Sequence, residues 1–493
     1  SAKMSIVVKE GQNRSALVRD GLDFPIIDTD FHTIEIEPLF LDYLHQVGGP
    51  EIVERYKEVR KAARTAWYNQ TWEERRANRT ARPPWWTIPT HDTLDLATFA
   101  LPKLLHQRLE EIGTDFAVLY PNLSLFVASL EDDELRRAAV RALNIYSAEV
   151  YGAYSDRMTP IAVIPLHTPE EGIEELEYAV NTLGLKAILI VGYVRRPIPS
   201  IVDKYPELAR EAYWLDFFGI DSQYDYDPFW EKCVELKVTP TLHTAGMGWT
   251  SRRSISNYTF NHIGHFASAS EALAKSLFFG GVTRRFPTLK FAFIEGGVSW
   301  GASLYPDLVW HWERRNTESL HKLYNPGNID HKLLRELYEQ YGDESITRHI
   351  DQIGNGLGVI SNHQQESEDT LDDWSALNIT RAEDIRDLFV NNFYFGIEGD
   401  DPTIASAFNR KELPFAEPLK AFLASDAGHW DVPVISEVVA DVHSLVEQGR
   451  LSPEDFKSFV FANPAKLYAD SNPDFFKGTV VEKDVEKLLN RGK

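Results

Sequence analysis

The sequence predicts an α/β fold, a parallel (β/α)8 barrel (TIM barrel) that forms a single domain over residues 1–493. Short segments rich in apolar and β-branched residues alternate with longer charged segments of helical pattern, which is typical of βα units and a parallel sheet. Several of the short segments are continuous apolar runs, as expected for strands that helices cover on both sides. Their number, eight, favours closure into a barrel.

The eight predicted strands occur at intervals along the whole chain. In order they are residues 24–30, 116–121, 158–166, 186–192, 238–243, 289–295, 392–397 and 421–426. Polar side chains cluster at the C-terminal ends of the first, fifth, sixth and eighth of these segments. Because barrels of this type carry their chemistry at that end, we expect the functional site there.

Two stretches, residues 51–89 and 316–384, do not fit the repeating βα unit. The first is charged and rich in tryptophan, and the second is polar and acidic. Loops vary most at the C-terminal face, so both are predicted to be helical or loop insertions over that face. The alternative is that they are peripheral helices or helices that contact a second copy of the chain. Tryptophan-rich walls would favour a bulky, partly apolar substrate.

Composition limits the classes of partner. The chain has 51 Lys and Arg against 74 Asp and Glu, a net charge of −23, which argues against nucleic acid and anionic membranes as partners. The single cysteine, Cys233, excludes an intrachain disulfide framework. No apolar run approaches the roughly 20 residues that span a bilayer, and no secretory signal is seen. We therefore expect a cytoplasmic protein with a small-molecule partner, and leave a homo-oligomer open.

The first predicted strand ends in acid and imidazole groups. Asp30 and His32 are two residues apart, so on a strand both point to the same side, toward the barrel axis. A carboxylate and an imidazole at this spacing suit zinc, iron or manganese. A hydrogen-bonded structural pair would look the same, and a metal site therefore requires further ligands.

Two other strand ends supply such ligands. His243 ends the fifth predicted strand and is followed by small residues, and Asp426 ends the eighth. In a closed barrel, groups at matching strand ends converge on one point near the axis. The four residues together therefore predict a metal site.

These motifs resemble the amidohydrolase superfamily, specifically the branch that includes aminocarboxymuconate semialdehyde decarboxylase and related decarboxylases and hydrolases. The resemblance rests on residues 28–32 with Glu37 and Pro38, on residues 242–246 and on residues 425–426. Residues 144–156 leading into 161–166, residues 286–290 and residues 462–468 also match.

The resemblance implies that Asp30, His32, His243 and Asp426 bind a divalent metal, Zn, Fe or Mn. The metal would lower the pKa of a bound water, and Asp426 would combine metal binding with the role of general base. One ion is expected. A second ion is left open, because binuclear relatives use a Lys or Glu at the end of the fourth strand, and residues 190–193 offer neither.

The chain departs from the family at the sixth predicted strand. Decarboxylating relatives often keep a histidine there, and this chain has Glu295. Glu295 would serve as a fifth metal ligand, as a general base, or as a hydrogen-bonding partner of a ligand. An oxygen-rich ligand set of this kind favours iron or manganese over zinc.

Three further histidines are candidates. His262 and His265 are three residues apart, so they are predicted to share one helix face and to reach the metal as substrate-binding or proton-transfer groups. Ordinary packing histidines are the alternative. His429 would support a ligand, contact the substrate or be an ordinary loop residue.

The sequence thus predicts a metal-dependent hydrolase. It would use a metal-bound water to cleave an amide, a thioester or an activated C–C bond of a small organic acid or its conjugate. The predicted catalytic residues are Asp426, Glu295, His262 and His265. The first alternative is a non-oxidative decarboxylase in the same site, and the second is a barrel that binds a metal or ligand without turnover.

Overall fold

Eight parallel strands form the central sheet of the computed structural model, which describes residues 14–84, 88–243, 253–353 and 366–491. The strand order is β1-β2-β3-β4-β7-β8-β9-β10. The strands are β1 (Ile27–Thr33), β2 (Phe116–Pro121), β3 (Met158–Ile164), β4 (Ala187–Val191), β7 (Pro240–His243), β8 (Phe291–Phe293), β9 (Phe393–Ile397) and β10 (Lys420–Leu423). All eight predicted strands are therefore confirmed, although the first begins three residues later than expected.

Contacts between β1 and the segment after β10 close the barrel. Phe31 pairs with Ala427 in parallel, and the His32 N–H donates to the Ala427 carbonyl over 2.7 Å. The Asp426 N–H donates to the Asp30 carbonyl over 2.9 Å. Closure therefore joins the end of the first strand directly to the residues that follow the last one.

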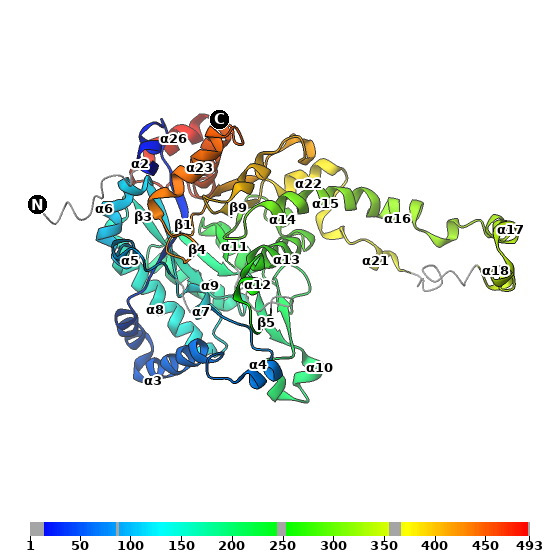
Figure 1. Cartoon of the computed structure of the whole chain (residues 1–493), viewed down its shortest axis with the longest axis horizontal. Helices are drawn as coiled ribbons and strands as arrows, with labels where there is room; N and C mark the ends of the chain where they lie inside the picture. Colours follow the sequence, from blue (N-terminus) through cyan, green and yellow to red (C-terminus); the bar gives the residue numbers. More distant parts are fainter. Residues whose placement is uncertain (1–13, 85–87, 244–252, 354–365, 492–493) are drawn as a thin grey trace, which may run out of the picture.

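Helices surround the strands, as a sheet buried on both faces requires (Figure 1). In the first half of the chain they are α2 (Arg14–Asp20), α3 (Glu37–Thr65), α4 (Trp72–Asn78), α5 (Thr93–Ala100), α6 (Pro102–Ile112), α7 (Ser124–Ala128), α8 (Asp133–Tyr151), α9 (Pro169–Glu177), α10 (Pro199–Val202) and α11 (Asp227–Glu235). Helix α9 packs closely because Gly172 has no side chain; a Cβ there would lie 2.5 Å from Leu166 Cδ2.

The second half of the chain continues the ring of helices. They are α12 (Tyr258–His262), α13 (His265–Phe279), α14 (Val282–Arg285), α15 (Ser299–Arg315), α16 (Thr317–Leu323), α17 (His331–Tyr341), α18 (Glu344–Thr347), α21 (Glu368–Leu371), α22 (Ala382–Phe389), α23 (Val438–Glu447), α24 (Pro453–Lys457), α25 (Asn463–Ala469) and α26 (Glu482–Arg491). Among the described helices, none combines the length and hydrophobicity that a bilayer crossing requires.

The described residues of the first insertion, 51–84 and 88–89, include several that line the pocket at the mouth of the barrel. Helix α3 is kinked at Gly49, whose φ is +83°, and Pro50 follows inside the helix. The part after the kink presents Tyr56, Arg60 and Arg64, which are four residues apart and share one face, to the pocket described below.

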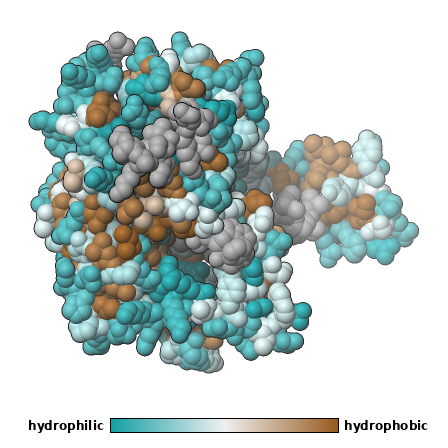
Figure 2. Space-filling model, turned by 60° about the vertical axis from the view of Figure 1, so that its left-hand side comes forward, coloured by the Kyte–Doolittle hydropathy of each residue, from teal (hydrophilic) through white to brown (hydrophobic). Residues whose placement is uncertain are grey.

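Several of the described helices of residues 316–384 lie away from the barrel, unlike those of the first insertion. Helices α16, α17 and α18 form an arm that projects away from the barrel in both Figure 1 and Figure 2. None of the described arm residues 317–352 is buried in these elements. No described residue of 316–384 lines either cavity at the metal centre.

A short antiparallel hairpin was not predicted. It consists of β5 (Val194–Pro197) and β6 (Tyr213–Asp216) and follows β4. The buried Arg196 fixes it, because its guanidinium donates to Asp216 over 2.6 Å and to the Tyr226 hydroxyl over 2.8 Å.

Candidate metal centre

The side chains of Asp30 and His32 on the first strand lie on the same side of that strand, as predicted. Asp30 and His32 lie on β1 and are 0% and 4% exposed. His32 Nε2 is 3.0 Å from Asp30 Oδ1. Their burial at a strand end means that any charge there must be compensated within the barrel.

His243 and Glu295 meet from adjacent strands. His243 is the last residue of β7, and Glu295 follows β8 by two residues. His243 Nε2 and His32 Nε2 are each 2.9 Å from Glu295 Oε1. Glu295 therefore reaches the same point as the two histidines, which was the position expected of a fifth ligand.

Asp426 completes this convergence. Its Oδ1 lies 2.7 Å from His32 Nε2. Asp426 and Glu295 both have positive φ angles, +61° and +67°, in the left-handed region that side chains other than glycine rarely adopt. Backbone strain of this kind is concentrated at functional sites, where it aims a side chain.

His429, whose role the sequence left open, belongs to the same group. Its ring stacks on that of His32 with centroids 3.7 Å apart, and its Nδ1 is 2.8 Å from Asp426 Oδ1. Its Nε2 is 2.7 Å from Asn122 Oδ1. The position of His429 three residues after Asp426 was the signal available in the sequence.

The donor set fits a divalent cation. One ligand atom each from His32, Glu295, Asp426 and His429 lies within 4.8 Å of the others. Nearby, both carboxylate oxygens of Asp30 and Asp426 and both ring nitrogens of His243 are buried without a hydrogen-bond partner. Buried polar atoms are normally hydrogen-bonded, so atoms that crowd together without such bonds are arranged for an ion.

The electrostatics without a cation show how strongly these groups interact. Burial opposes the charge of His32, but Asp30 and Glu295 prevail and raise its pKa to about 10. Burial and the charge of Glu295 raise the pKa of Asp426 well above its ordinary value. Burial and the neighbouring His32 lower the pKa of His429 to about 3. A bound cation would reverse this preference for protonated carboxylates.

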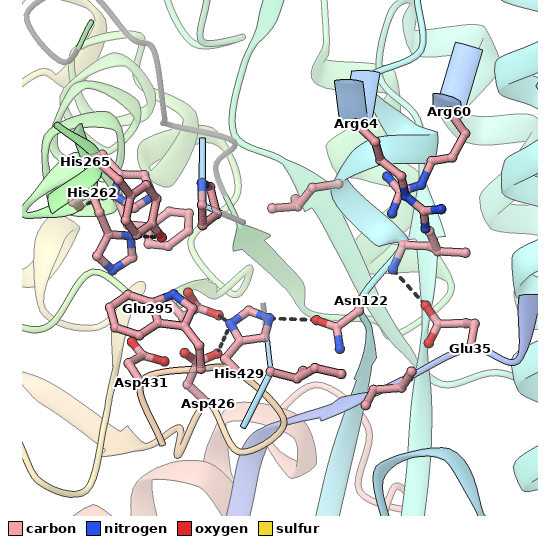
Figure 3. A pocket seen from close by; sticks show the side chains of 18 of the residues that line it. Glu35, Arg60, Arg64, Asn122, His262, His265, Glu295, Asp426, His429 and Asp431 are labelled. Carbon is pink, nitrogen blue, oxygen red and sulfur yellow. Dashed lines mark hydrogen bonds and ion pairs between the residues drawn. The ribbon is translucent and has the colours of Figure 1, made fainter. Parts of the chain in front are cut away.

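A pocket of about 580 Å³ opens at this cluster and has a different chemistry at its other end (Figure 3). Glu295, Asp426 and His429 line one end, and Arg60, Arg64, Glu35 and Glu37 line the other. The intervening wall is largely apolar and is formed by Ile34, Tyr56, Ile88, Leu123, Leu125, Phe266 and Trp430.

Arg60 has no fixed counter-charge. Its guanidinium lies 4.5 Å from the centroid of the Phe126 ring, and its Nε is buried without a hydrogen bond. Burial and the charge of Arg64 lower the pKa of Arg60. Within the described chain Arg60 forms no ion pair, whereas Arg64 lies 3.8 Å from Glu37. This end of the pocket therefore favours an anion.

His262 and His265 reach the pocket, but the prediction that they share a helix face is wrong. Helix α12 ends at His262, and α13 begins at His265. Gly264 between them has φ +75° and breaks the helix. The rings still lie 4.7 Å apart, and burial lowers the pKa of both, that of His265 to about 4.

Residues 244–246, part of the motif after the fifth strand, lie outside the described residues. So do Trp85 and Trp86 of the first insertion. His243 and the described part of that insertion, including Arg60, carry the site.

Comparison with known proteins agrees with this architecture. Residues 107–325 match the amidohydrolase family. A 2-keto-4-carboxy-3-hexenedioate hydratase of Sphingobium sp. is 27% identical over 212 residues, 42% of this chain and 52% of the hydratase. The chain thus matches about half the length of that curated relative.

Solved structures with a similar fold include two decarboxylases. A dihydroxybenzoic acid decarboxylase of Polaromonas sp. JS666, solved with manganese and 2-nitroresorcinol, is 16% identical with a TM-score of 0.49 over 92% of this chain and 99% of its own. A 5-carboxyvanillate decarboxylase of Sphingomonas paucimobilis is 14% identical with a TM-score of 0.49 over 90% and 99%. The match to the amidohydrolase family covers residues 107–325, somewhat less than half of the chain, and the donor set of the site fits a metal-dependent enzyme of that family.

Proposed function

We propose that this chain is a metal-dependent lyase that removes a carboxyl group, as carbon dioxide, from a small planar acid. The observation that carries the proposal is the polarity of the pocket. Carboxylate and imidazole donors gather at one end, guanidinium groups without a full set of counter-charges lie at the other, and apolar side chains line the wall between them. Such a pocket suits a flat molecule with an anionic group at each end.

At the metal end, we propose Asp30, His32, His243, Glu295 and Asp426 as ligands, with His429 as a further donor. Their contacts of 2.7 to 3.0 Å and their buried atoms without hydrogen bonds support this assignment. A bound divalent cation would supply positive charge that stabilises negative charge developing on the substrate.

At the far end, Arg60 and Arg64 would bind the second anionic group. Arginine binds carboxylates through two parallel hydrogen bonds, which fixes orientation as well as position. This contact would direct the scissile carboxyl group toward the metal. The curated hydratase acts, by its name, on an unsaturated acid with several carboxylates, which supports a substrate of this class.

The hydrolase prediction depended largely on Glu295, which stands where decarboxylating relatives keep a histidine, and it gave Asp426 the role of base. Both carboxylates contact histidines of the ligand group, and holding a cation would occupy them. This favours a reaction that needs no activated water. Loss of carbon dioxide requires that a proton reach the substrate carbon as the bond to the carboxyl group breaks. His262 and His265 line the pocket beside Glu295 and are neutral because burial lowers their pKa, so we assign to them the relay of that proton from solvent.

Hydration of a carbon–carbon double bond is the second candidate, because the curated relative is a hydratase. It would use the same ligands and the same arginines. The difference lies in the product, which gains water and keeps its carboxyl groups.

One experiment separates these reactions. Protein loaded with Mn²⁺ is incubated in ¹⁸O-labelled water with 2,6-dihydroxybenzoate, 5-carboxyvanillate or 2-keto-4-carboxy-3-hexenedioate. Decarboxylation releases carbon dioxide and gives a product that lacks one carbon and has gained no water. A product that keeps all its carbon and gains the mass of one labelled water indicates hydration, and a cleaved product that gains it indicates hydrolysis. Either result would replace the proposed reaction. Incubation without protein corrects for exchange of the keto oxygen with water.

Substitution of Arg60 tests whether the substrate carries a second anionic group. Arg60→Met should raise KM about 10- to 100-fold with little change in kcat, because one charged hydrogen-bonding partner is lost. Arg60→Lys should recover part of the loss. Arg55→Met is the control, since Arg55 lies on the same helix and pairs with Asp132 and Glu134 instead of lining the pocket. Equal KM values for Arg60→Met and the wild type would show that Arg60 does not bind the substrate.

A further inference from the structure

A second group of carboxylates adjoins the metal centre. Glu398 follows β9 directly, and Asp431 lies in the loop after β10. One oxygen each from Glu398, Asp426 and Asp431 lies within 4.8 Å of the other two. Asp426 therefore belongs both to this acidic group and to the group that contains the histidines.

The acidic group has no counter-charge of its own. In the described part of the chain, no lysine or arginine forms an ion pair with any of the three residues, and the contacts of Asp426 are to His32 and His429. Burial and the charges of Asp431 and Glu295 raise the pKa of Glu398 to about 10. Carboxylates packed this closely require either a shared proton or a cation.

Asp426 has one oxygen to spare. It is 1% exposed, and its Oδ1 faces the two histidines at 2.7 and 2.8 Å. Its Oδ2 is buried and accepts no hydrogen bond, and Oδ1 of Asp431 is buried without one as well. Figure 3 shows the Asp431 carboxylate beside that of Asp426. Buried oxygens that receive no hydrogen bond are suited to an ion.

A separate cavity leads to this group. It has a volume of about 390 Å³, and its walls include Glu398, Asp400, Asp401 and Asp431. It adjoins the larger pocket, with which it shares the lining residues His262, His265, Phe266, Glu295 and Asp431. An acidic passage concentrates cations, whereas the arginine end of the other pocket attracts anions.

We propose that Glu398, Asp431 and Asp426 hold a second divalent cation, bridged to the first through the Asp426 carboxylate. Because all three ligands are oxygens, the site would take a hard ion such as Mn²⁺ or Mg²⁺. Binuclear relatives bridge their two ions with a Lys or Glu at the end of the fourth strand. This chain has Val191 at that strand end, so the proposed second ion would use a different bridging residue. The inference is independent of the reaction proposed above.

The test is the number of ions bound at saturation. Purified full-length protein is stripped of metal, equilibrated with Mn²⁺ and measured for Mn per chain by equilibrium dialysis and elemental analysis. Two ions per chain are expected for the wild type and one for Glu398→Gln. Two Mn²⁺ ions bridged by a carboxylate should also give a spin-coupled electron paramagnetic resonance spectrum, which Glu398→Gln should convert to that of an isolated ion.

Two further variants keep the test decisive. Asp431→Asn should lose the same ion if Glu398→Gln fails to fold. Asp400→Asn lines the same cavity outside the group of three and should keep both ions. One ion in the wild type at saturation would mean that the carboxylates share a proton, and two ions in both Glu398→Gln and Asp431→Asn would place the second ion elsewhere. Either result overturns the proposal.

Discussion

Two buried charged clusters in this barrel, one around Arg136 and one around Asp426, differ in how far their polar atoms are hydrogen-bonded. Around Arg136, whose side chain is 1% exposed, every nitrogen has an acceptor. Glu171 accepts two hydrogen bonds at 2.9 and 2.8 Å, and Asp133 and the Leu130 carbonyl accept others at 2.7 and 2.8 Å. Around Asp426, by contrast, buried oxygens and nitrogens lie close together without hydrogen bonds.

The difference separates a structural cluster from a binding cluster. Arg136 and Glu171 compensate each other, so the folded chain needs nothing more at that place. The carboxylates around Asp426 repel one another until a cation is present, and the fold must hold them there at a cost in stability. Changes in the first cluster should therefore alter folding, and changes in the second should alter metal binding and catalysis.

The largest effect should follow Asp426→Asn. Turnover should fall about 10²- to 10⁴-fold, because a ligand and its charge are lost together. Bound metal per chain should fall as well. The unfolding free energy of the metal-free variant should equal or exceed that of the wild type, because burial and Glu295 oppose a charge on Asp426 and an amide carries none. Elemental analysis measures the bound metal, and urea denaturation measures the unfolding free energy. A large loss of stability in the metal-free variant would mean that the cluster around Asp426 is structural, like the one around Arg136.

Arg136→Met should show the opposite pattern. It removes the buried partner of Glu171 and leaves only the exposed Arg137 at 3.7 Å, which should reduce the unfolding free energy by about 3–5 kcal/mol. Metal content per folded chain should not change. Arg136→Met combined with Glu171→Leu should recover most of the stability, because no buried charge remains. Loss of metal in the folded single variant would show that the two clusters are coupled.

Glu35 is hydrogen-bonded, like the residues around Arg136, but its charge is uncompensated, like the charges around Asp426. It accepts hydrogen bonds from the Leu123 N–H over 2.7 Å and the Thr33 hydroxyl over 3.2 Å, but it has no cationic partner among the described residues. Burial outweighs these bonds and raises its pKa from 4.5 to about 7. The folded state therefore binds this proton more tightly than the unfolded state does.

The pH dependence follows from that sign. The stability contributed by protonated Glu35 is complete below pH 4.5 and is lost as the pH rises through about 7. Over this range the unfolding free energy of the wild type should fall by roughly 3 kcal/mol relative to that of Glu35→Gln. Denaturant unfolding of both proteins at several pH values measures the difference. Parallel curves would mean that Glu35 is ionised throughout.

The smallest effect should come from Asn122, which contacts a member of the binding cluster without belonging to it. Asn122→Ala removes the acceptor 2.7 Å from His429 Nε2 and should weaken metal binding about tenfold, because the ring loses its orientation. Asn122→Asp keeps an acceptor oxygen and should restore the affinity. Metal titration of the three proteins tests this, and equal weakening by both substitutions would indicate a steric role only.

The fold and most of the candidate site could be predicted because both depend on strands. A parallel strand in a barrel is an apolar run, and its end is marked by polar residues such as Asp30 and His243. The β5–β6 hairpin was missed because it is held by Arg196, whose partners Asp216 and Tyr226 are distant in sequence. The break between His262 and His265 depends on the left-handed conformation of Gly264, which periodicity does not reveal.

The sequence by itself determined the order of the eight strands and the residues at their ends, because hydrophobic periodicity and strand alternation are local properties. Only the tertiary structure decided which of these residues meet. Closure of β1 onto the segment after β10 brings Asp30 to Asp426, and the kink in α3 turns Arg60 into the pocket. The bridging position of Asp426 between two groups of carboxylates was equally hidden, because distances between strand ends are set by barrel closure and not by spacing along the chain.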